Sequence, residues 1–273
     1  MTRCMNDYKK TGSMDIDLLQ RTAVGAAYKS AKAIQSRRGR VTIRKKGDID
    51  LVTEADIESE RIIVDTIRER FPDHFILAEE SEAREPPDSD TDTWVIDPLD
   101  GTTNFAHQLP FFAVSIAYVR NGAPIVGVVL CPDTGELFTA AKGKGAELNG
   151  RKIHVSESTD ITESLLATGF PYDLKQHLVP IMKRLERCVS ASRGVRRFGA
   201  AALDLCYLAC GRFDGFWEQH LKPWDTAAGE LIAREAGAAV TNFSNDPFTI
   251  NDDEILATNG HIHSHMISLL ELK

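Results

Sequence analysis

The chain has 273 residues, of which 42% are hydrophobic and 26% are charged, and its formal net charge is −8. This length and composition suit one compact folded unit, and the negative charge argues against a general nucleic-acid binder, which needs broad positive potential. No apolar run approaches the length of a membrane-spanning helix, so we expect no membrane partner.

The N-terminal residues and the cysteines indicate the compartment. Residues 1–14 combine basic and polar residues without the apolar stretch of a secretory signal, so we expect a flexible tail and no export. The five cysteines, an odd number without a C-x-x-C pair, indicate scattered thiols in a reducing environment. We therefore predict a cytoplasmic protein.

The N-terminal half predicts helices followed by strands. Residues 15–35 carry apolar side chains near a 3.6-residue period and predict a helix. Thr53, with Asp56 three residues on, resembles the start of a second helix that Pro72 would end. Short apolar runs predict strands at residues 75–78 and 93–96, and an antiparallel meander at residues 112–119, 125–130 and 136–141.

The C-terminal half predicts a helix at residues 200–209, a strand at 213–216 and a helix at 223–236. Helices come before, between and after the groups of strands, which favours layers of helices and sheets without strict β-α-β repetition. We expect a single domain over residues 15–273 with two lobes, at about residues 15–145 and 146–273.

The motif DPLDGTTN, residues 97–104, follows an apolar run and places two carboxylates where we expect the chain to leave a sheet. Pro98 restricts the backbone and Gly101 frees it, so a turn here could point both acids and a carbonyl at one ion. Amide groups near Gly101 and Thr102 could receive a phosphate if a helix begins there. The alternative interpretation is an ordinary surface turn.

Other acids stand at the ends of predicted elements, where sites are usually built. They are Glu79 and Glu80 after a strand, Asp225 at a helix start, and Asp56. Each has a plain alternative: a solvated loop, an N-cap, or a partner of a helix dipole. A convergent set of acids is costly without cations, and these oxygen ligands suit Mg²⁺ better than zinc.

Several motifs resemble those of the inositol monophosphatase family, and they occur in the family's order. They are DLVTEAD at residues 50–56, AEES at 78–81, WVIDPLDGTTN at 94–104, GKGA at 143–146 and WDTAAG at 224–229. The resemblance covers most of the chain from about residue 15. It implies a mixed α/β fold, a layered α-β-α-β-α sandwich, together with Mg²⁺ dependence and a homodimer.

The resemblance also implies roles for individual acids. Glu79, Asp97 and the Leu99 carbonyl match the ligands of a first metal ion, while Asp97, Asp100 and Asp225 match those of a second. Glu79 would also help to hold a weaker third ion, which makes two or three Mg²⁺ ions in all.

The catalytic candidates are Thr102, Asp56 and Glu79. The resemblance implies that Thr102 positions a nucleophilic water and that Asp56 accepts a hydrogen bond from the threonine. The phosphate would bind the metal ions and the amides of Gly101 and Thr102. No nucleophile-elbow or P-loop motif indicates a covalent route.

The substrate is expected to be a small phosphorylated polyol, with inositol monophosphate as the leading candidate. Glu218 matches a position that binds substrate hydroxyls in the family, Lys45 matches a lysine near the entrance, and Asp100 lies beside the expected phosphate site. Ala200 stands where the family usually has a hydroxyl residue, so a substrate contact is expected to be missing. Fructose-1,6-bisphosphate or another polyol phosphate is the alternative.

Basic residues between positions 37 and 46 raise a second kind of function. They could dock RNA or a protein partner in a non-enzymatic regulator, or they could be a solvated hairpin near an anionic site. No aromatic residues alternate with these charges to stack on bases, which favours the solvated hairpin. Arg196 and Arg197 could likewise add charge near the pocket or be solvated.

Overall fold

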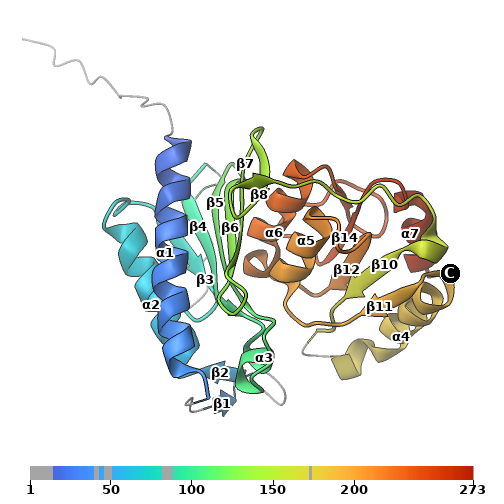
Figure 1. Ribbon diagram of the computed structural model, residues 1–273, viewed down its shortest axis with the longest axis horizontal. Coiled ribbons are helices and arrows are strands. Elements are labelled where there is room, and N and C mark those ends of the chain that lie inside the picture. The colour runs from blue at the N-terminus through green and yellow to red at the C-terminus, as the bar shows by residue number, and fades with distance from the viewer. Residues whose placement is uncertain are drawn as a thin grey trace, which may run out of the picture.

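The protein is a five-layered α-β-α-β-α sandwich (Figure 1). The structure, a computed structural model, describes residues 15–39, 43–45, 51–81, 88, 90–171 and 174–272. The layers confirm the predicted mixed α/β fold. The expected tail at residues 1–14 lies outside the described residues. In the described residues, no helix is long and apolar enough to cross a membrane.

Two antiparallel helices form the first layer, α1 (Ile16–Arg37) and α2 (Glu54–Arg68). The Asp15 side chain caps α1 by accepting the Leu18 amide hydrogen at 2.9 Å. Thr53 and Asp56 form a capping box at the start of α2, as the sequence predicts. A short hairpin, β1 (Ile43–Lys45) with β2 (Leu51–Thr53), leads into α2.

The second layer is a seven-stranded sheet in the order β3-β4-β5-β6-β7-β8-β9. Only β3 and β4 run parallel, and the predicted meander is confirmed as β5 to β7. Its strands are β3 (Phe75–Ala78), β4 (Thr93–Asp100), β5 (Ala113–Arg120), β6 (Ala123–Cys131), β7 (Glu136–Ala141), β8 (Gly145–Leu148) and β9 (Arg151–Lys152).

The predicted strand at residues 93–96 is too short, because β4 continues to Asp100, and the chain leaves the sheet directly after the two acids. Pairing with β5 is regular up to Asp97 and shifts before Asp100. Pro98 has no amide hydrogen to give to the ladder, and the Leu99 amide donates to Asp97 Oδ1 at 2.9 Å instead. The strand therefore bulges, and the chain turns only at Gly101 into α3 (Thr102–Ala106).

The middle layer consists of α5 (Ala201–Ala209) and α6 (Pro223–Glu235), which pack on each other and lie between the two sheets (Figure 1). Both helices agree with the prediction to within one residue. Their small residues let them lie close together, and eight of the nine residues of α5 are buried. The starts of both helices lie near the end of β4, and residues of all three line one cavity.

A five-stranded sheet and two helices complete the molecule. The strand order is β11-β10-β12-β14-β13, and α4 (Leu174–Ala191) and α7 (His263–Leu270) cover its outer face (Figure 1). The predicted strand at residues 213–216 is found at residues 215–219. The strands are β10 (Leu165–Thr168), β11 (Gly194–Arg196), β12 (Gly215–Gln219), β13 (Ala239–Thr241) and β14 (Glu254–Thr258).

The hydrophobic core follows the layers. Along β4, Trp94 and Ile96 face α1 and α2, whereas Val95 faces the middle helices, as the two-residue period of a strand requires. A third cluster joins the second sheet to α4 and α7. Burial on both faces holds β4 rigidly, and its last residues carry the acids of the site.

Candidate active site

A cavity of about 360 Å³ gathers most of the acids that the sequence singled out, but Glu80 and Asp56 do not line it. It lies where the end of β4 and the start of α3 meet the starts of α5 and α6 and the end of β12. Its lining includes Glu79, Asp97, Leu99, Asp100, Gly101, Thr102, Glu218 and Asp225. Segments more than 100 residues apart in the chain therefore converge on one hollow.

The turn from β4 into α3 depends on Gly101. Its φ is +89°, and a Cβ there would lie 3.0 Å from the Phe111 carbonyl oxygen. An L-residue would be strained in this conformation, so glycine fits both the angle and the space. A short helix does begin at Thr102. From the sequence, the amides of Gly101 and Thr102 are expected to receive a phosphate only with such a helix start.

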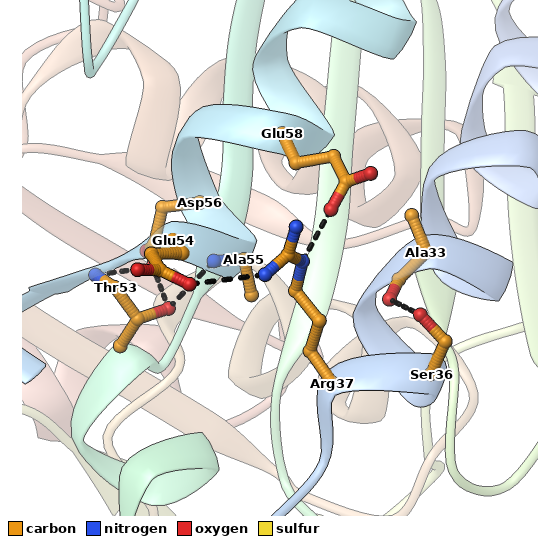
Figure 2. A network of polar contacts seen from close by, with 8 residues as sticks. All are labelled: Ala33, Ser36, Arg37, Thr53, Glu54, Ala55, Asp56 and Glu58. Carbon is orange, nitrogen blue, oxygen red and sulfur yellow. Dashed lines mark hydrogen bonds and ion pairs between the residues drawn. The ribbon is translucent and has the colours of Figure 1, made fainter. Parts of the chain in front are cut away.

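Thr102 and Asp56 form the pair that the resemblance implies. The Thr102 hydroxyl lies 2.8 Å from Asp56 Oδ1 and 3.0 Å from the Leu99 carbonyl oxygen, and both can accept its hydrogen. Asp56 is fully buried, which raises its pKa, while hydrogen bonds from Thr53 and Thr102 oppose that rise. Figure 2 shows the contact between Asp56 and Thr53. Asp56 is thus fixed behind Thr102.

Asp100 links the first sheet to the middle layer of helices. Its Oδ2 accepts the Ala202 amide hydrogen at 2.9 Å. Ala200 is the N-cap residue of α5 and has no side-chain capping bond, so Asp100 supplies the missing acceptor from another element. Ala200, which stands where the family usually has a hydroxyl residue, cannot cap α5 with its own side chain. The Asp100 carboxylate caps this helix instead.

Asp225 combines a structural role at the start of α6 with a place on the cavity. The N-cap residue of α6 is Lys222, so Asp225 is not the N-cap. As the third helical residue, it accepts the Lys222 amide hydrogen on Oδ2 at 2.7 Å and so helps to close the helix start. The same half-buried side chain lines the cavity. A carboxylate has more acceptor positions than one amide uses, so this hydrogen bond leaves oxygen lone pairs for a ligand.

Burial and mutual repulsion raise the pKa values of these acids. Burial raises the pKa of Asp100 to about 7, with a contribution from Glu79, and that of Asp225 to about 7, with a contribution from Asp100. The pKa of Asp97 is also raised, first by burial and then by Glu79, Asp100 and Asp225. Burial and Asp225 raise the pKa of Glu218 to about 8. A bound cation would relieve this repulsion.

The donor set fits Mg²⁺. Within the described residues, no group of three or more His, Cys, Asp or Glu side chains lies close enough together to hold a metal ion. Mg²⁺ does not require such a group, because it retains several waters and need not be enclosed by protein side chains. The carboxylates of Glu79, Asp97, Asp100 and Asp225 and the Leu99 carbonyl are hard oxygen donors on one cavity.

Comparison with known proteins decides the family. The model of the inositol monophosphatase family matches residues 15–272. The chain belongs to the inositol monophosphatase family. It is 45% identical over 258 residues to the inositol-1-monophosphatase of Synechocystis, covering 94% of this chain and 90% of that protein.

A further relative has a different name, and a solved structure has nearly the same description as the Synechocystis protein. The Vibrio cholerae protein named Nus factor SuhB is 46% identical over 243 residues, covering 89% of this chain and 90% of that protein. The inositol monophosphatase structure from Anabaena superposes with a TM-score of 0.85 and 41% identity, over 94% of this chain and 96% of that one. Family membership makes the chain a phosphatase by descent and leaves its substrate open.

Of the remaining predicted site residues, Glu218 and Arg197 line the cavity. Glu218 is 8% exposed and lines the cavity from the end of β12. Lys45 lies on β1, but its side chain is outside the described ones, so its role stays a prediction. Arg197 lines the cavity and its guanidinium lies 5.5 Å from the centre of the Phe170 ring, whereas Arg196 does not line it.

Other residues of the site were missed. Phe170, His220 and Lys222 also line the cavity. Asp204, on the first turn of α5, is fully buried, and neither of its oxygens has a hydrogen-bond partner among the described residues. Burial, with Glu218 and Asp100, raises its pKa. Asp204 does not line the cavity, but it lies near enough to Glu218 and Asp100 for their charges to act on it. A lone acid in an otherwise apolar helix was a signal that could have identified it.

Proposed function

We propose that this protein hydrolyses the phosphate monoester of a small polyol, with inositol monophosphate as the leading candidate, by attack of water in the presence of Mg²⁺. The observation that carries the proposal is that one cavity is lined by four acids suited to bind a metal ion and by Thr102, which donates to the buried Asp56 behind it. Each feature alone has a structural explanation, but their combination supports phosphate chemistry.

Glu79, Asp97, Asp100, Asp225 and the Leu99 carbonyl would hold the metal ions. When bound, Mg²⁺ makes water a better nucleophile at neutral pH and stabilises negative charge on the phosphate and the leaving oxygen. The raised pKa values of Asp97, Asp100 and Asp225 support this assignment, because such groups lose their protons readily only when positive charge is near.

Thr102 would orient the attacking water. Asp56 and the Leu99 carbonyl both compete for the hydroxyl hydrogen, so the oxygen of Thr102 is left to accept a hydrogen bond from water. Thr102 is 6% exposed, which limits the directions from which water can reach it. The water is thereby held with a lone pair free for phosphorus.

The rest of the cavity supports a polyol ester. The amides of Gly101 and Thr102 open α3 beside the acids and would bind phosphate oxygens. Glu218 lies on the same cavity and would accept or donate a hydrogen bond to a substrate hydroxyl. The volume of about 360 Å³ is at the lower end of the range for small-molecule sites, which favours a compact substrate.

A panel of phosphate esters tests the proposal. Phosphate release would be measured from inositol monophosphate, fructose-1,6-bisphosphate, histidinol phosphate and a nucleotide, each with Mg²⁺ and with a chelator. We expect inositol monophosphate to give the highest kcat/KM. A clear preference for another ester would replace the substrate and keep the reaction, and no Mg²⁺-dependent release from any would contradict the proposal.

A second candidate function is regulation through a nucleic acid or protein partner, which the name of the Vibrio relative, Nus factor SuhB, favours. The described part of the basic run argues against an RNA surface there. Arg37 pairs with Glu54 and Glu58 (Figure 2), and Arg38 pairs with Asp133. Binding of RNA that weakens steeply with salt, measured on a variant without activity, would support the second candidate.

A further inference from the structure

One face of α2 holds three separate parts of the candidate site. Asp56 accepts from Thr102, and Ser59 donates to the Pro98 carbonyl at 2.7 Å. Glu60 accepts from the chain just after β3. Positions 56, 59 and 60 share a helix face, and all three side chains are at least nine-tenths buried. Of the three, only Asp56 has a role predicted from the sequence and the family resemblance.

Glu60 uses both carboxylate oxygens on the segment that follows Glu79. Its Oε2 accepts the Glu80 amide hydrogen at 2.8 Å, and its Oε1 accepts the hydroxyl hydrogen of Ser81. On the other side, the Glu79 amide donates to the Ile96 carbonyl of β4 at 3.2 Å. The backbone of Glu79 is therefore held on both sides.

This restraint opposes electrostatic repulsion. Glu79 lines the cavity beside Asp97 and Asp100 and contributes to the raised pKa of each. In the absence of a cation, like charges would push an unrestrained Glu79 away from the other acids. The hydrogen bonds to Glu60 connect it to a rigid helix and limit that movement.

We propose that Glu60 is a positioning residue that holds the segment from Glu79 to Ser81 and thereby sets the affinity of the cavity for a divalent cation. The inference rests on the proposed metal-dependent function and adds a determinant of metal affinity that does not itself touch the ion. A purely structural alternative is that Glu60 joins α2 to β3 without affecting the cavity.

Glu60→Gln separates these alternatives. Glutamine has nearly the same volume but one acceptor oxygen, so its amino group would face one of the two donors and that contact would be lost. In the metal-free protein, hydrogen exchange at the Glu80 amide is expected to become about ten-fold faster. The dissociation constant for Mg²⁺ alone, measured by calorimetry, is expected to rise about ten-fold.

Two further variants provide a control and a second test. Glu58→Gln makes the same chemical change on the same helix, where the partner is Arg37, and should leave the Mg²⁺ dissociation constant unchanged. Ser81→Ala removes the other half of the contact with a small perturbation and should weaken Mg²⁺ binding in the same direction. The double variant Glu60→Gln/Ser81→Ala should weaken binding by less than the product of the two single effects.

The outcomes are distinct. Unchanged Mg²⁺ affinity in Glu60→Gln, with a lowered melting temperature, would overturn the inference and leave a structural role. If Glu60→Gln does not fold, unchanged affinity in Ser81→Ala overturns it equally. A wild-type protein that binds no Mg²⁺ would overturn the proposed function as well. If the wild type releases phosphate with Mg²⁺ but Glu60→Gln and Ser81→Ala bind Mg²⁺ as tightly as the wild type, only this inference is overturned.

Discussion

At the scale of single residues, the side chains with chemical roles also have structural ones. Asp225 accepts the amide hydrogen of Lys222 at the start of α6, Asp100 caps α5 from another layer, and Asp56 belongs to a capping box. Each leaves at least one oxygen lone pair toward the cavity or toward Thr102. Substitution of these acids therefore alters both catalysis and helix ends, and Thr102 and Glu218 give cleaner tests.

Thr102→Val should lower kcat by about two orders of magnitude while the Mg²⁺ dissociation constant stays within about two-fold of wild type. Valine keeps the shape but cannot orient water. Thr102→Ser retains the hydroxyl and should restore most of the activity. Steady-state kinetics with calorimetric Mg²⁺ titration checks this, and a fully active valine variant would remove Thr102 from the mechanism.

Glu218→Gln should alter selectivity more than turnover. The ratio of kcat/KM for inositol monophosphate to that for glycerol 2-phosphate, which lacks the ring hydroxyls, should fall about ten-fold because one substrate hydrogen bond weakens. Parallel kinetics on the two esters measures it. An unchanged ratio would show that Glu218 does not recognise the polyol.

Most residues of the site that could be predicted from sequence lie in a local motif, and Glu218 was predicted from its match to a family position. DPLDGTTN and WDTAAG identify Asp97, Asp100 and Asp225. His220 and Phe170 could not be predicted, because they reach the cavity only through the pairing of strands far apart in the chain. The acceptor role of Glu60 depends in the same way on how α2 packs beside β3.

At the scale of elements, hydrophobic periodicity identified α1, α5, α6 and the meander. It did not identify the end of β4, the helix α4, or the short strands β10 and β11. The end of β4 was misplaced because a carboxylate captures a backbone amide within the strand. No helix was predicted at α4, which contains Pro180, a residue that usually ends a helix. β10 and β11 have only four and three residues, too few for a recognisable period.

The contact between α6 and the first sheet depends on Gly127 in β6. A Cβ there would lie 2.8 Å from the Ala228 carbonyl oxygen, so Gly127→Ala should destabilise the protein by about 1–3 kcal/mol. A Cβ added at Gly25, inside α1, would meet no described residue outside that helix within 4 Å, and Gly25→Ala should stabilise by about 0.5–1 kcal/mol. Urea unfolding of the pair should give opposite signs, and two shifts of equal sign would contradict this packing.

At the scale of the whole molecule, the layer order follows from the distribution of helices and strands, but the strand order β11-β10-β12-β14-β13 does not. That order depends on pairings between distant segments, which no local pattern specifies. It places the start of α6 and the end of β12 opposite β4 and so completes the cavity. The expected homodimer and the two-lobe division stay predictions.

The buried acids predict how stability depends on pH. The folded-state pKa values of Asp100, Asp225 and Glu218, about 7, 7 and 8, exceed the ordinary values of 3.8, 3.8 and 4.5. These groups bind more protons in the folded state, so their contribution to metal-free stability should decline as pH rises from about 4 to 8. Mg²⁺ should bind more tightly as they deprotonate, and should raise the melting temperature more at pH 8.5 than at pH 6. An equal rise at both pH values would contradict this linkage.

The central claim is that the acids of this cavity hold the Mg²⁺ on which phosphate hydrolysis depends. Its most direct test is phosphate release from inositol monophosphate by the wild type and by Asp97→Asn, each with Mg²⁺ and with a chelator, beside Asp65→Asn as an exposed control on α2. We predict Mg²⁺-dependent release by the wild type and the control, and a loss of at least about 100-fold in Asp97→Asn with its fold intact. Near-normal release by Asp97→Asn, or release by the wild type that the chelator leaves unchanged, would contradict the claim.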